Sequence, residues 1–395
     1  MKTGWLAAVM LASTLLAGWA WQTEKDSSTW NEQELAILQT LRLQNLPALQ
    51  DASNAVQHHP AAADLGRQLF FDQRLSRNGK VACATCHQPD KAFSDGKTVA
   101  EALARGTRNT PALPGVAYND WFFWDGRKDS LWSQALAPLE NPAEHGLTRT
   151  RIIRLLLQDP HYRQQFTQLF ATPTDSEWWQ HLPEDASPNG TLTQLQAWKQ
   201  MDSQQRQQVD RTFAHLGKAI AAYVSSLPPP ANALDNLPQT ALSPEAAAGA
   251  RLFIGKAQCI LCHSGPLLSN QTFQNIGTGS LGQDSGRAAV LDAILTDRFN
   301  CLGEYSDASA DDCGELKFLS RSRHALAGAF KVPGLRNVAQ TAPYFHDGRM
   351  ATLEEVVDYY VEASRQTGQR RDNELPAIEL DVTEKHQLLS FLRIL

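Results

Sequence analysis

The chain has 395 residues with a formal net charge of −6, and 20% of its residues are charged. A chain of this length is long for one domain and suits two, and a hydrophobic content of 42% is enough for a packed core in each. The charge balance is mildly acidic and the sequence has no basic run, which argues against nucleic acid as a partner.

At the N-terminus the sequence has the pattern of a secretory signal peptide. Lys2 precedes an apolar stretch over residues 5–20 that ends in small residues. We therefore predict a signal peptide over residues 1–20 and a periplasmic mature protein without a stable membrane span. An uncleaved membrane anchor is the alternative, and it is less favoured because the stretch is shorter than the roughly 20 residues that span a bilayer.

Two C-x-x-C-H motifs follow, one in each half of the chain. They are Cys83-Ala84-Thr85-Cys86-His87 and Cys259-Ile260-Leu261-Cys262-His263. In such a motif the two thiols form thioethers with a haem and the histidine ligates its iron. A zinc site would need further ligands of the right type, and neither motif has a second C-x-x-C nearby. The sequence therefore predicts two covalently bound c-type haems, with His87 and His263 as iron ligands.

A second repeat accompanies the motifs. Residues 109–131 and 331–353 align at a constant offset of 222 with nine identities, whereas the motif histidines are offset by 176. The second half therefore carries 46 extra residues between its motif and its repeat. We predict a mainly α fold with two cytochrome c-type haem domains in tandem, related by internal duplication. The expected domains are residues 55–227 and 244–395, joined by a linker over residues 228–243 that begins with prolines.

Apolar residues recur with helical spacing in four segments, and no sustained alternation typical of strands occurs. The predicted helices are Thr150–Phe170, Val209–Ser226, Leu353–Ser364 and Thr383–Leu395. Between the first two, the segment Pro173–Gly190 is expected to be a loop-rich excursion.

Two cysteines remain outside the motifs, and both lie in the extra segment of the second half. Cys301 and Cys313 are twelve residues apart. In an oxidising compartment a close leftover pair is expected to form a disulfide, which would staple this insertion.

The sixth ligand of each haem iron decides its chemistry, because electron-transfer haems usually have that position filled, often by methionine. Only Met201 and Met350 remain after signal cleavage, and neither is well placed. The offset of the repeat superposes Tyr360 on Pro138. A phenolic oxygen can ligate iron and a proline ring cannot. We therefore predict that Tyr360 ligates the second haem and that the first haem is open, the alternative being that Tyr360 is a core aromatic.

Taken together, these residues resemble the bacterial di-haem cytochrome c peroxidase and MauG family, from about Leu65 to the C-terminus. Besides the two haem motifs, four segments carry the resemblance: Arg108-Asn109-Thr110-Pro111, Phe123-Trp124-Asp125-Gly126-Arg127, Asn141-Pro142-Ala143-Glu144 and Thr341-Ala342-Pro343-Tyr344-Phe345-His346-Asp347-Gly348.

The resemblance implies roles for residues around the first haem. Trp124 matches the tryptophan that lies between the two haems and relays electrons or holes. Gln134 and Glu144, ten and twenty residues further on, match the distal pair of the peroxidatic haem. A carboxylate there can take a proton from H2O2 and return it to the leaving oxygen. Glu140 is the rival carboxylate, and surface positions for Gln134 and Glu144 are the alternative.

The resemblance also implies a calcium site between the domains. Asn109 and the carbonyl groups of Thr341 and Pro343 match its ligands. Tyr360 falls where the peroxidases of the family have methionine and where MauG has its axial tyrosine. The implied cofactors are two c-type haems and one calcium ion.

The sequence departs from the family pattern in two places. Many peroxidases of the family hold a removable distal histidine after the first motif, but no histidine occurs between His87 and His145. The first haem should therefore be open without reductive activation. The surface-relay tryptophan of MauG is absent as well, since Ala257 and Gln258 precede the second motif. The cysteine-containing insertion is similar to that of the MauG homologues associated with copper-peptide operons, the MbnH type.

Two hypotheses for the function follow. In the leading one, a di-haem peroxidase uses H2O2 at the open first haem and oxidises an exported partner protein, as MauG does. In the alternative, a cytochrome c peroxidase reduces H2O2 with electrons from a small cytochrome or cupredoxin. A pure electron-transfer cytochrome is disfavoured because the first haem is expected to be open.

Overall fold

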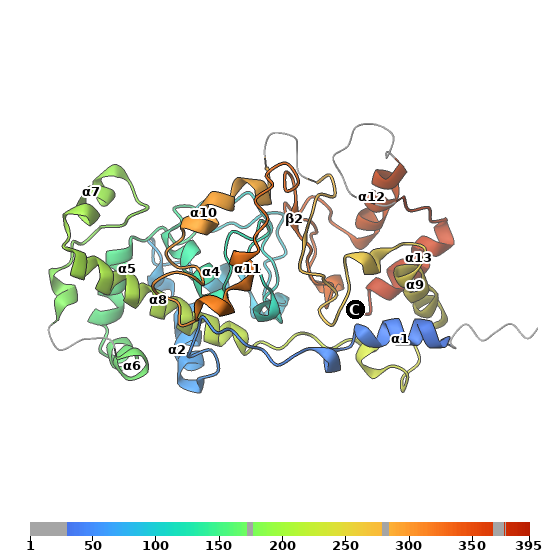
Figure 1. The fold of residues 1–395 in the computed structure, drawn as a ribbon, viewed down its shortest axis with the longest axis horizontal. Helices are drawn as coiled ribbons and strands as arrows, with labels where there is room; N and C mark the ends of the chain where they lie inside the picture. The colour runs from blue at the N-terminus through green and yellow to red at the C-terminus, as the bar shows by residue number, and fades with distance from the viewer. Residues whose placement is uncertain (1–29, 172–176, 279–283, 366–374, 376) are drawn as a thin grey trace, which may run out of the picture.

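The computed structural model describes residues 30–171, 177–278, 284–365, 375 and 377–395 (Figure 1). The predicted signal peptide lies outside the described residues. The fold is mainly helical, as predicted. The α-helices are α1 (Glu32–Thr40), α2 (Pro60–Phe71), α3 (Cys83–Cys86), α4 (Leu131–Glu140), α5 (Arg149–Gln158), α6 (Pro160–Phe170), α7 (Leu192–Gln200), α8 (Ser203–Ser225), α9 (Pro244–Ile254), α10 (Leu291–Thr296), α11 (Gly314–Lys317), α12 (Leu353–Arg365) and α13 (Val382–Leu392).

Short 3-10 helices and one small sheet complete the described elements. The 3-10 helices are Leu43–Asn45, Gln73–Leu75, Pro89–Lys91, Val116–Tyr118, Trp178–His181, Ala233–Asn236, Cys259–Leu261, Arg287–Ala289, Ala310–Asp312 and Val338–Gln340. The strands β1 (Phe273–Gln274) and β2 (Phe330–Lys331) pair antiparallel, with Phe273 opposite Lys331. Within the described ranges no helix combines the length and apolar character that a membrane crossing needs.

A first lobe, at one end of the elongated molecule in Figure 1, contains α2 and α4–α8. Its long helix α8 packs against both α2 and α4. These crossings are close because glycines stand at the contacts. A Cβ atom on Gly66 would lie 1.9 Å from the carbonyl oxygen of Ala219, and one on Gly217 would lie 2.4 Å from that of Trp132. Any larger residue at either position would push the helices apart. The packing of α2 and α4 on α8 therefore depends on these two glycines.

A second lobe contains α9, α12 and α13, together with α1 from the start of the chain (Figure 1). Helix α9 crosses α13 as closely as α2 crosses α8, because a Cβ atom on Gly249 would lie 2.0 Å from the carbonyl oxygen of Gln387. Leu38 and Leu41 from the α1 segment are fully buried in the core of this lobe. No sequence pattern had indicated that residues before the first haem motif pack in the second half.

One helix prediction was wrong in its extent. The segment Thr150–Phe170 is not one helix, because α5 ends at Gln158 and α6 begins at Pro160. Asp159 has an extended backbone and its side chain caps α6, and a residue that precedes proline disfavours helical geometry. Helix α8 begins six residues earlier than predicted, with Asp202 as its N-terminal cap.

The predicted disulfide between Cys301 and Cys313 is present, with 5.7 Å between the Cα atoms. The insertion that contains this disulfide also carries α10 and α11, and it lies against the first lobe (Figure 1), although its sequence belongs to the second half. Phe299 and Tyr305 of the insertion are buried in the core of the first lobe.

Charged contacts fix the insertion in this position. Arg298 pairs with the buried Asp210 of α8 at 2.6 Å, and Asp307 pairs with Lys218 of the same helix at 2.8 Å. The insertion therefore joins the two halves rather than forming a separate surface loop.

The repeat blocks have matching local structure at the offset of 222. The helices α4 and α12 begin at equivalent residues, Leu131 and Leu353. Phe123 and Phe345 both have a left-handed backbone, with φ of 66° and 68°. This conformation is strained for a bulky side chain, and it reverses the chain at the same point of each block.

Candidate haem sites and the junction between them

The first haem motif forms α3 and the turn after it. The Nδ1 atom of His87 lies 3.0 Å from the carbonyl oxygen of Phe93. That carbonyl accepts the Nδ1 hydrogen, which leaves the Nε2 lone pair for a metal. Burial lowers the pKa of His87, so its imidazole is neutral, as an iron ligand must be.

The second motif repeats this arrangement. The Nδ1 atom of His263 lies 3.0 Å from the carbonyl oxygen of Leu268, and burial lowers the pKa of His263 as well. None of the four motif cysteines is in a disulfide, and burial raises the pKa of the Cys83 thiol to about 12 and that of Cys86 to about 11. Thiols outside any disulfide, beside an oriented histidine, are the groups that covalent haem attachment needs, so both motifs fit a c-type haem.

A cavity lies beside the first motif and is partly open to solvent. The motif lines it together with α4 and the turn after α4, which contribute Gln134, Pro138 and Glu144. The structure thus brings both predicted distal residues and the predicted open position to the cavity of His87.

Glu144 is the carboxylate of this cavity, and its rival is engaged elsewhere. The Asn141 side-chain amide donates to Oε1 of Glu144 at 2.6 Å. Burial raises the pKa of Glu144, an effect that the charge of Arg127 only partly offsets. Glu140 instead accepts hydrogen bonds from Arg149 at 2.6 Å and from the Ser187 hydroxyl at 2.5 Å.

Sequence reasoning missed His145, which also lines the cavity. Its Nδ1 atom lies 2.6 Å from the carbonyl oxygen of Leu75, and burial lowers its pKa. The sequence analysis used His145 only as the end of a histidine-free stretch. Its place directly after Glu144 was the signal that could have identified it.

Tyr360 lies on α12 beside the second motif. It packs against the second core together with Cys259 and Ile260. Burial raises the pKa of Tyr360, and the nearby thiols of Cys259 and Cys262 act in the same direction. Phe345 packs edge-on against its ring, with 6.2 Å between the ring centroids. The offset of the repeat therefore leads to a tyrosine close to the second haem motif, as a ligand would need to be.

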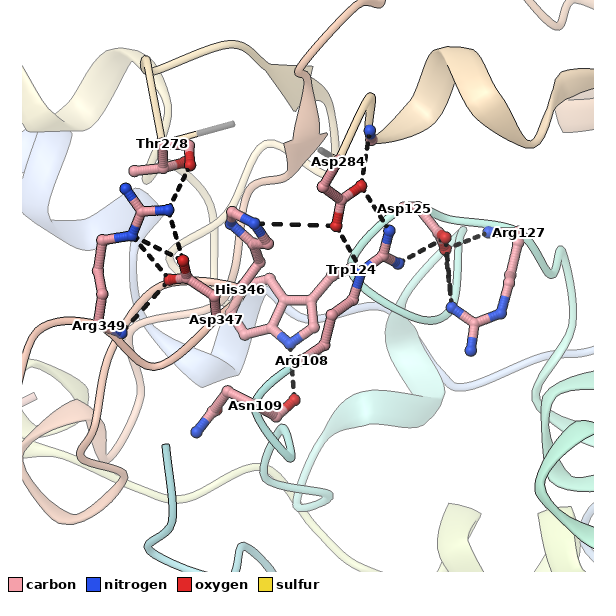
Figure 2. A network of polar contacts seen from close by, with 11 residues as sticks. Arg108, Asn109, Trp124, Asp125, Arg127, Thr278, Asp284, His346, Asp347 and Arg349 are labelled. Atoms are coloured by element: carbon pink, nitrogen blue, oxygen red, sulfur yellow. Dashed lines mark hydrogen bonds and ion pairs between the residues drawn. The ribbon is translucent and has the colours of Figure 1, made fainter. Parts of the chain in front are cut away.

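Trp124 stands at the junction of the two halves (Figure 2). Its indole Nε1 donates to the carbonyl oxygen of Asn109 at 2.9 Å, while its own carbonyl accepts from the amide of Lys331 at 2.8 Å. The amide of Asn109 donates to the carbonyl oxygen of His346, also at 2.8 Å. Because 331 and 346 are 109 and 124 shifted by 222, these two backbone contacts are reciprocal, as at a two-fold interface.

An ion-pair network holds this junction together (Figure 2). Arg108 donates two hydrogen bonds to Asp284, at 2.9 and 3.0 Å, and pairs with Asp125 at 2.5 Å. His346 lies 3.9 Å from Asp284 and stacks on Phe330. Asp284 comes from the segment between the second motif and its repeat block. The sequence analysis missed it because no motif connects it to Arg108.

The structure places Asn109 next to the second repeat block but does not test the calcium prediction. The Asn109 side chain donates to the carbonyl oxygen of Lys97 at 2.8 Å. The Thr341 hydroxyl donates to Val338, and the peptide bond before Pro343 is cis. Among the described residues, no group of three carboxylate, histidine or cysteine side chains could hold a metal ion. The predicted ligands are one amide and two carbonyl groups, so they are of a different kind.

Comparisons with known proteins agree with this picture. The family model described as di-haem cytochrome c peroxidase matches residues 60–240. The methylamine utilization protein MauG of Paracoccus denitrificans is 30% identical over 346 residues, which is 80% of this chain and 78% of that protein. The cytochrome c551 peroxidase of Nitrosomonas europaea is 27% identical over 301 residues, which is 75% of this chain and 71% of that protein.

Solved structures share the fold. A MauG-like protein associated with microbial copper homeostasis has a TM-score of 0.60 at 24% identity, over 93% of this chain and 95% of that one. The diheme peroxidase BthA of Burkholderia thailandensis has a TM-score of 0.57 at 20% identity, over 88% of this chain and 89% of that one. With relatives of this identity and coverage, the chain belongs to the di-haem cytochrome c peroxidase and MauG family, and it is an oxidoreductase that acts on peroxide.

Proposed function

We propose that this enzyme reacts with H2O2 at the haem attached to Cys83 and Cys86 and passes the oxidising equivalents to an exported partner protein. The cavity beside His87 carries this proposal. Pro138 lines it at the position that corresponds to Tyr360, so α4 offers no side chain there that can ligate iron. Gln134 and Glu144 line the same space.

Glu144 and Gln134 have distinct tasks in the cavity. When bound, the haem supplies an iron centre at which peroxide can be cleaved. Glu144 takes a proton from the peroxide oxygen and returns it to the leaving oxygen, and its raised pKa helps both transfers near neutral pH. Asn141 holds Oε1 of this carboxylate, which leaves Oε2 for the proton. Gln134 orients the peroxide by hydrogen bonding without titrating.

In the second half, His263 and Tyr360 are the residues that would ligate the haem iron. The burial of Tyr360 and its closeness to the Cys259 and Cys262 thiols support this role. Trp124 is the proposed relay between the haems, which its contacts with both halves support. The matching local structures and the reciprocal contacts at the junction support two haem domains that arose by duplication.

Two further assignments belong to the same proposal. Asn109 and the carbonyl groups of Thr341 and Pro343 bind a calcium ion at the junction, a ligand type that calcium accepts. The mature protein works in the periplasm, where a disulfide such as Cys301–Cys313 persists.

A second candidate function is reduction of H2O2 with electrons from a small cytochrome or cupredoxin. One observation favours it. Ala257, buried at 1% exposure, and Gln258 occupy the place where MauG has its surface-relay tryptophan. This chain therefore lacks that particular route to a partner protein.

Stopped-flow spectroscopy separates the two functions. The fully ferric enzyme is mixed with stoichiometric H2O2, with and without a reduced small cytochrome. We expect a spectral change without any prior reduction, and an oxidised state that persists when no reductant is added. If peroxide reacts only after half-reduction, and turnover with the cytochrome is then fast, the second function is correct.

A further inference from the structure

Three tryptophans around the first site and the junction differ in the acceptor of their indole N–H. Trp124 donates to a backbone carbonyl at 2.9 Å, and Trp132 donates to the Ser53 hydroxyl at 2.8 Å. Trp121 donates to the Glu315 carboxylate at 3.1 Å. Of these three acceptors, only the carboxylate is a base to which the indole proton can be transferred.

Trp121 connects the relay region with the molecular surface. It precedes Trp124 by three residues, so their Cα atoms are within about 11 Å of each other along the chain. Its ring is buried at 4% exposure and packs in a small cluster with Ile294 and Leu316 of the insertion. Glu315, on α11, is exposed.

A buried cation restricts how Trp121 can be oxidised. The Arg287 guanidinium lies 3.8 Å above the Trp121 ring and donates to the carbonyl oxygens of Asp125 and Gly126, next to Trp124. Burial lowers the pKa of Arg287 to about 10, so it stays charged at neutral pH. A positive charge this close disfavours a radical cation on the ring. Loss of an electron from Trp121 is therefore favourable only when the indole proton leaves as well.

We propose that Trp121 and Glu315 form the outlet through which oxidising equivalents leave the enzyme. This rests on the proposed function, in which H2O2 is the oxidant. One electron passes from Trp121 to the peroxide-oxidised enzyme, and the Nε1 proton moves to the Glu315 carboxylate, which leaves a neutral indole radical. An electron from an oxidisable aromatic side chain of the partner then restores Trp121, and the proton returns from Glu315. One H2O2 drives two such transfers.

This outlet supplies what the second motif lacks. Ala257 and Gln258 cannot carry a radical. Trp121 can, and its indole N–H donates to the exposed Glu315 of the insertion. The insertion thereby has a second role besides joining the halves, because its helix α11 provides the proton acceptor. The partner is expected to meet the enzyme at this face, close to Glu315.

The outlet can be tested on the holoenzyme without the partner. Ferric enzyme is treated with stoichiometric H2O2, and oxygen addition to each tryptophan is measured by peptide mass mapping. Without a reductant, the radical is trapped where it resides, so we expect modification mainly at Trp121 and little at Trp132. Glu315→Gln keeps a hydrogen-bond acceptor but cannot accept the proton. It should lower modification of Trp121 by about tenfold or more, relative to the amount of oxidised enzyme formed.

Asp311→Asn is the matched control, because Asp311 is an exposed carboxylate of the same insertion that pairs with Lys317. It should leave the pattern unchanged. The outlet is overturned, and the peroxide reaction stands, if the enzyme reacts with H2O2 but Trp121 stays intact or Glu315→Gln matches the parent. Absence of both spectral change and modification overturns the outlet together with the proposed function.

Discussion

The lobes of this enzyme place different residues at one equivalent position. In the first lobe α4 begins at Leu131 and carries Pro138, whereas in the second lobe α12 begins at Leu353 and carries Tyr360. Both residues lie beside a haem motif whose histidine donates to a backbone carbonyl at 3.0 Å. The local scaffold is therefore shared, and in our proposal the side chain at this position decides which haem is open.

The comparison extends to the end of each helix. Helix α4 stops two residues after Pro138, and the turn that follows brings Glu144 and His145 to the cavity. Helix α12 is still helical at Ala363, which corresponds to Asn141. A proline near the end of α4 thus stands where the second lobe has a tyrosine, and it precedes the turn that carries Glu144, the proposed proton acceptor. Under the proposed function, this difference assigns the reaction with peroxide to the first lobe.

The largest expected effect concerns haem attachment itself. Replacing Cys83 and Cys86 with alanine should remove the covalent haem of the first lobe only, and replacing Cys259 and Cys262 should remove that of the second only. The parent should hold two haems that resist acid–acetone extraction. Intact mass measurement of each variant checks this. A parent with one haem per chain would contradict the claim that each lobe binds a covalent haem.

Loss of the proton acceptor should have the next largest effect. Glu144→Gln should slow the reaction of the ferric enzyme with H2O2 by on the order of 10²–10⁴-fold, since general acid–base groups contribute that much. The base must be deprotonated, so the parent rate should fall as pH drops through the pKa of Glu144, which burial places above the ordinary glutamate value.

Glu140→Gln is the matched control for this prediction. Glu140 bonds to Arg149 and Ser187, so the variant should lower thermal stability and leave the peroxide rate close to that of the parent. Equal rate losses in the two variants would show that Glu144 has no special role in the cavity.

A smaller effect is expected from the insertion that joins the lobes. Replacing Cys301 and Cys313 with alanine should lower the free energy of unfolding by about 2–3 kcal/mol, as for disulfides that close short loops. Because Phe299 and Tyr305 anchor the insertion in the first lobe, the loss should appear in the unfolding of that lobe. Denaturant titration of the parent and this variant measures the loss, and an unchanged midpoint would mean that packing alone holds the insertion.

The sequence predicted the parts of this structure that depend on local pattern. The offset of 222 superposed Leu131 on Leu353, and both residues begin a helix in the structure. The spacing from Trp124 led to Gln134 and Glu144, which both line the cavity. The disulfide was predicted from two leftover cysteines. One local signal was overlooked, since Pro160 should have divided the predicted helix over residues 150–170.

Contacts between distant segments could not be predicted in this way. Leu38 packs in the second lobe and Phe299 in the first, against their order in the chain. This could not be predicted, because an apolar residue type indicates burial but not the core in which the residue is buried. The pairs Arg108–Asp284 and Trp121–Glu315 join residues more than 170 positions apart and belong to no motif. The spacing from Trp124 favoured Glu144 over Glu140, and the structure adds that Glu144 lines the cavity whereas Glu140 bonds to Arg149 and Ser187.

The difference between Pro138 and Tyr360 is tested most directly by electron paramagnetic resonance of the ferric protein. We predict one high-spin haem in the first lobe and one low-spin haem in the second. Tyr360→Phe should convert the low-spin signal to a high-spin or water-ligated one and leave the other unchanged. A parent with two low-spin haems, or a Tyr360→Phe variant that keeps its low-spin signal, would contradict the assignment of an open first haem and a tyrosine-ligated second haem.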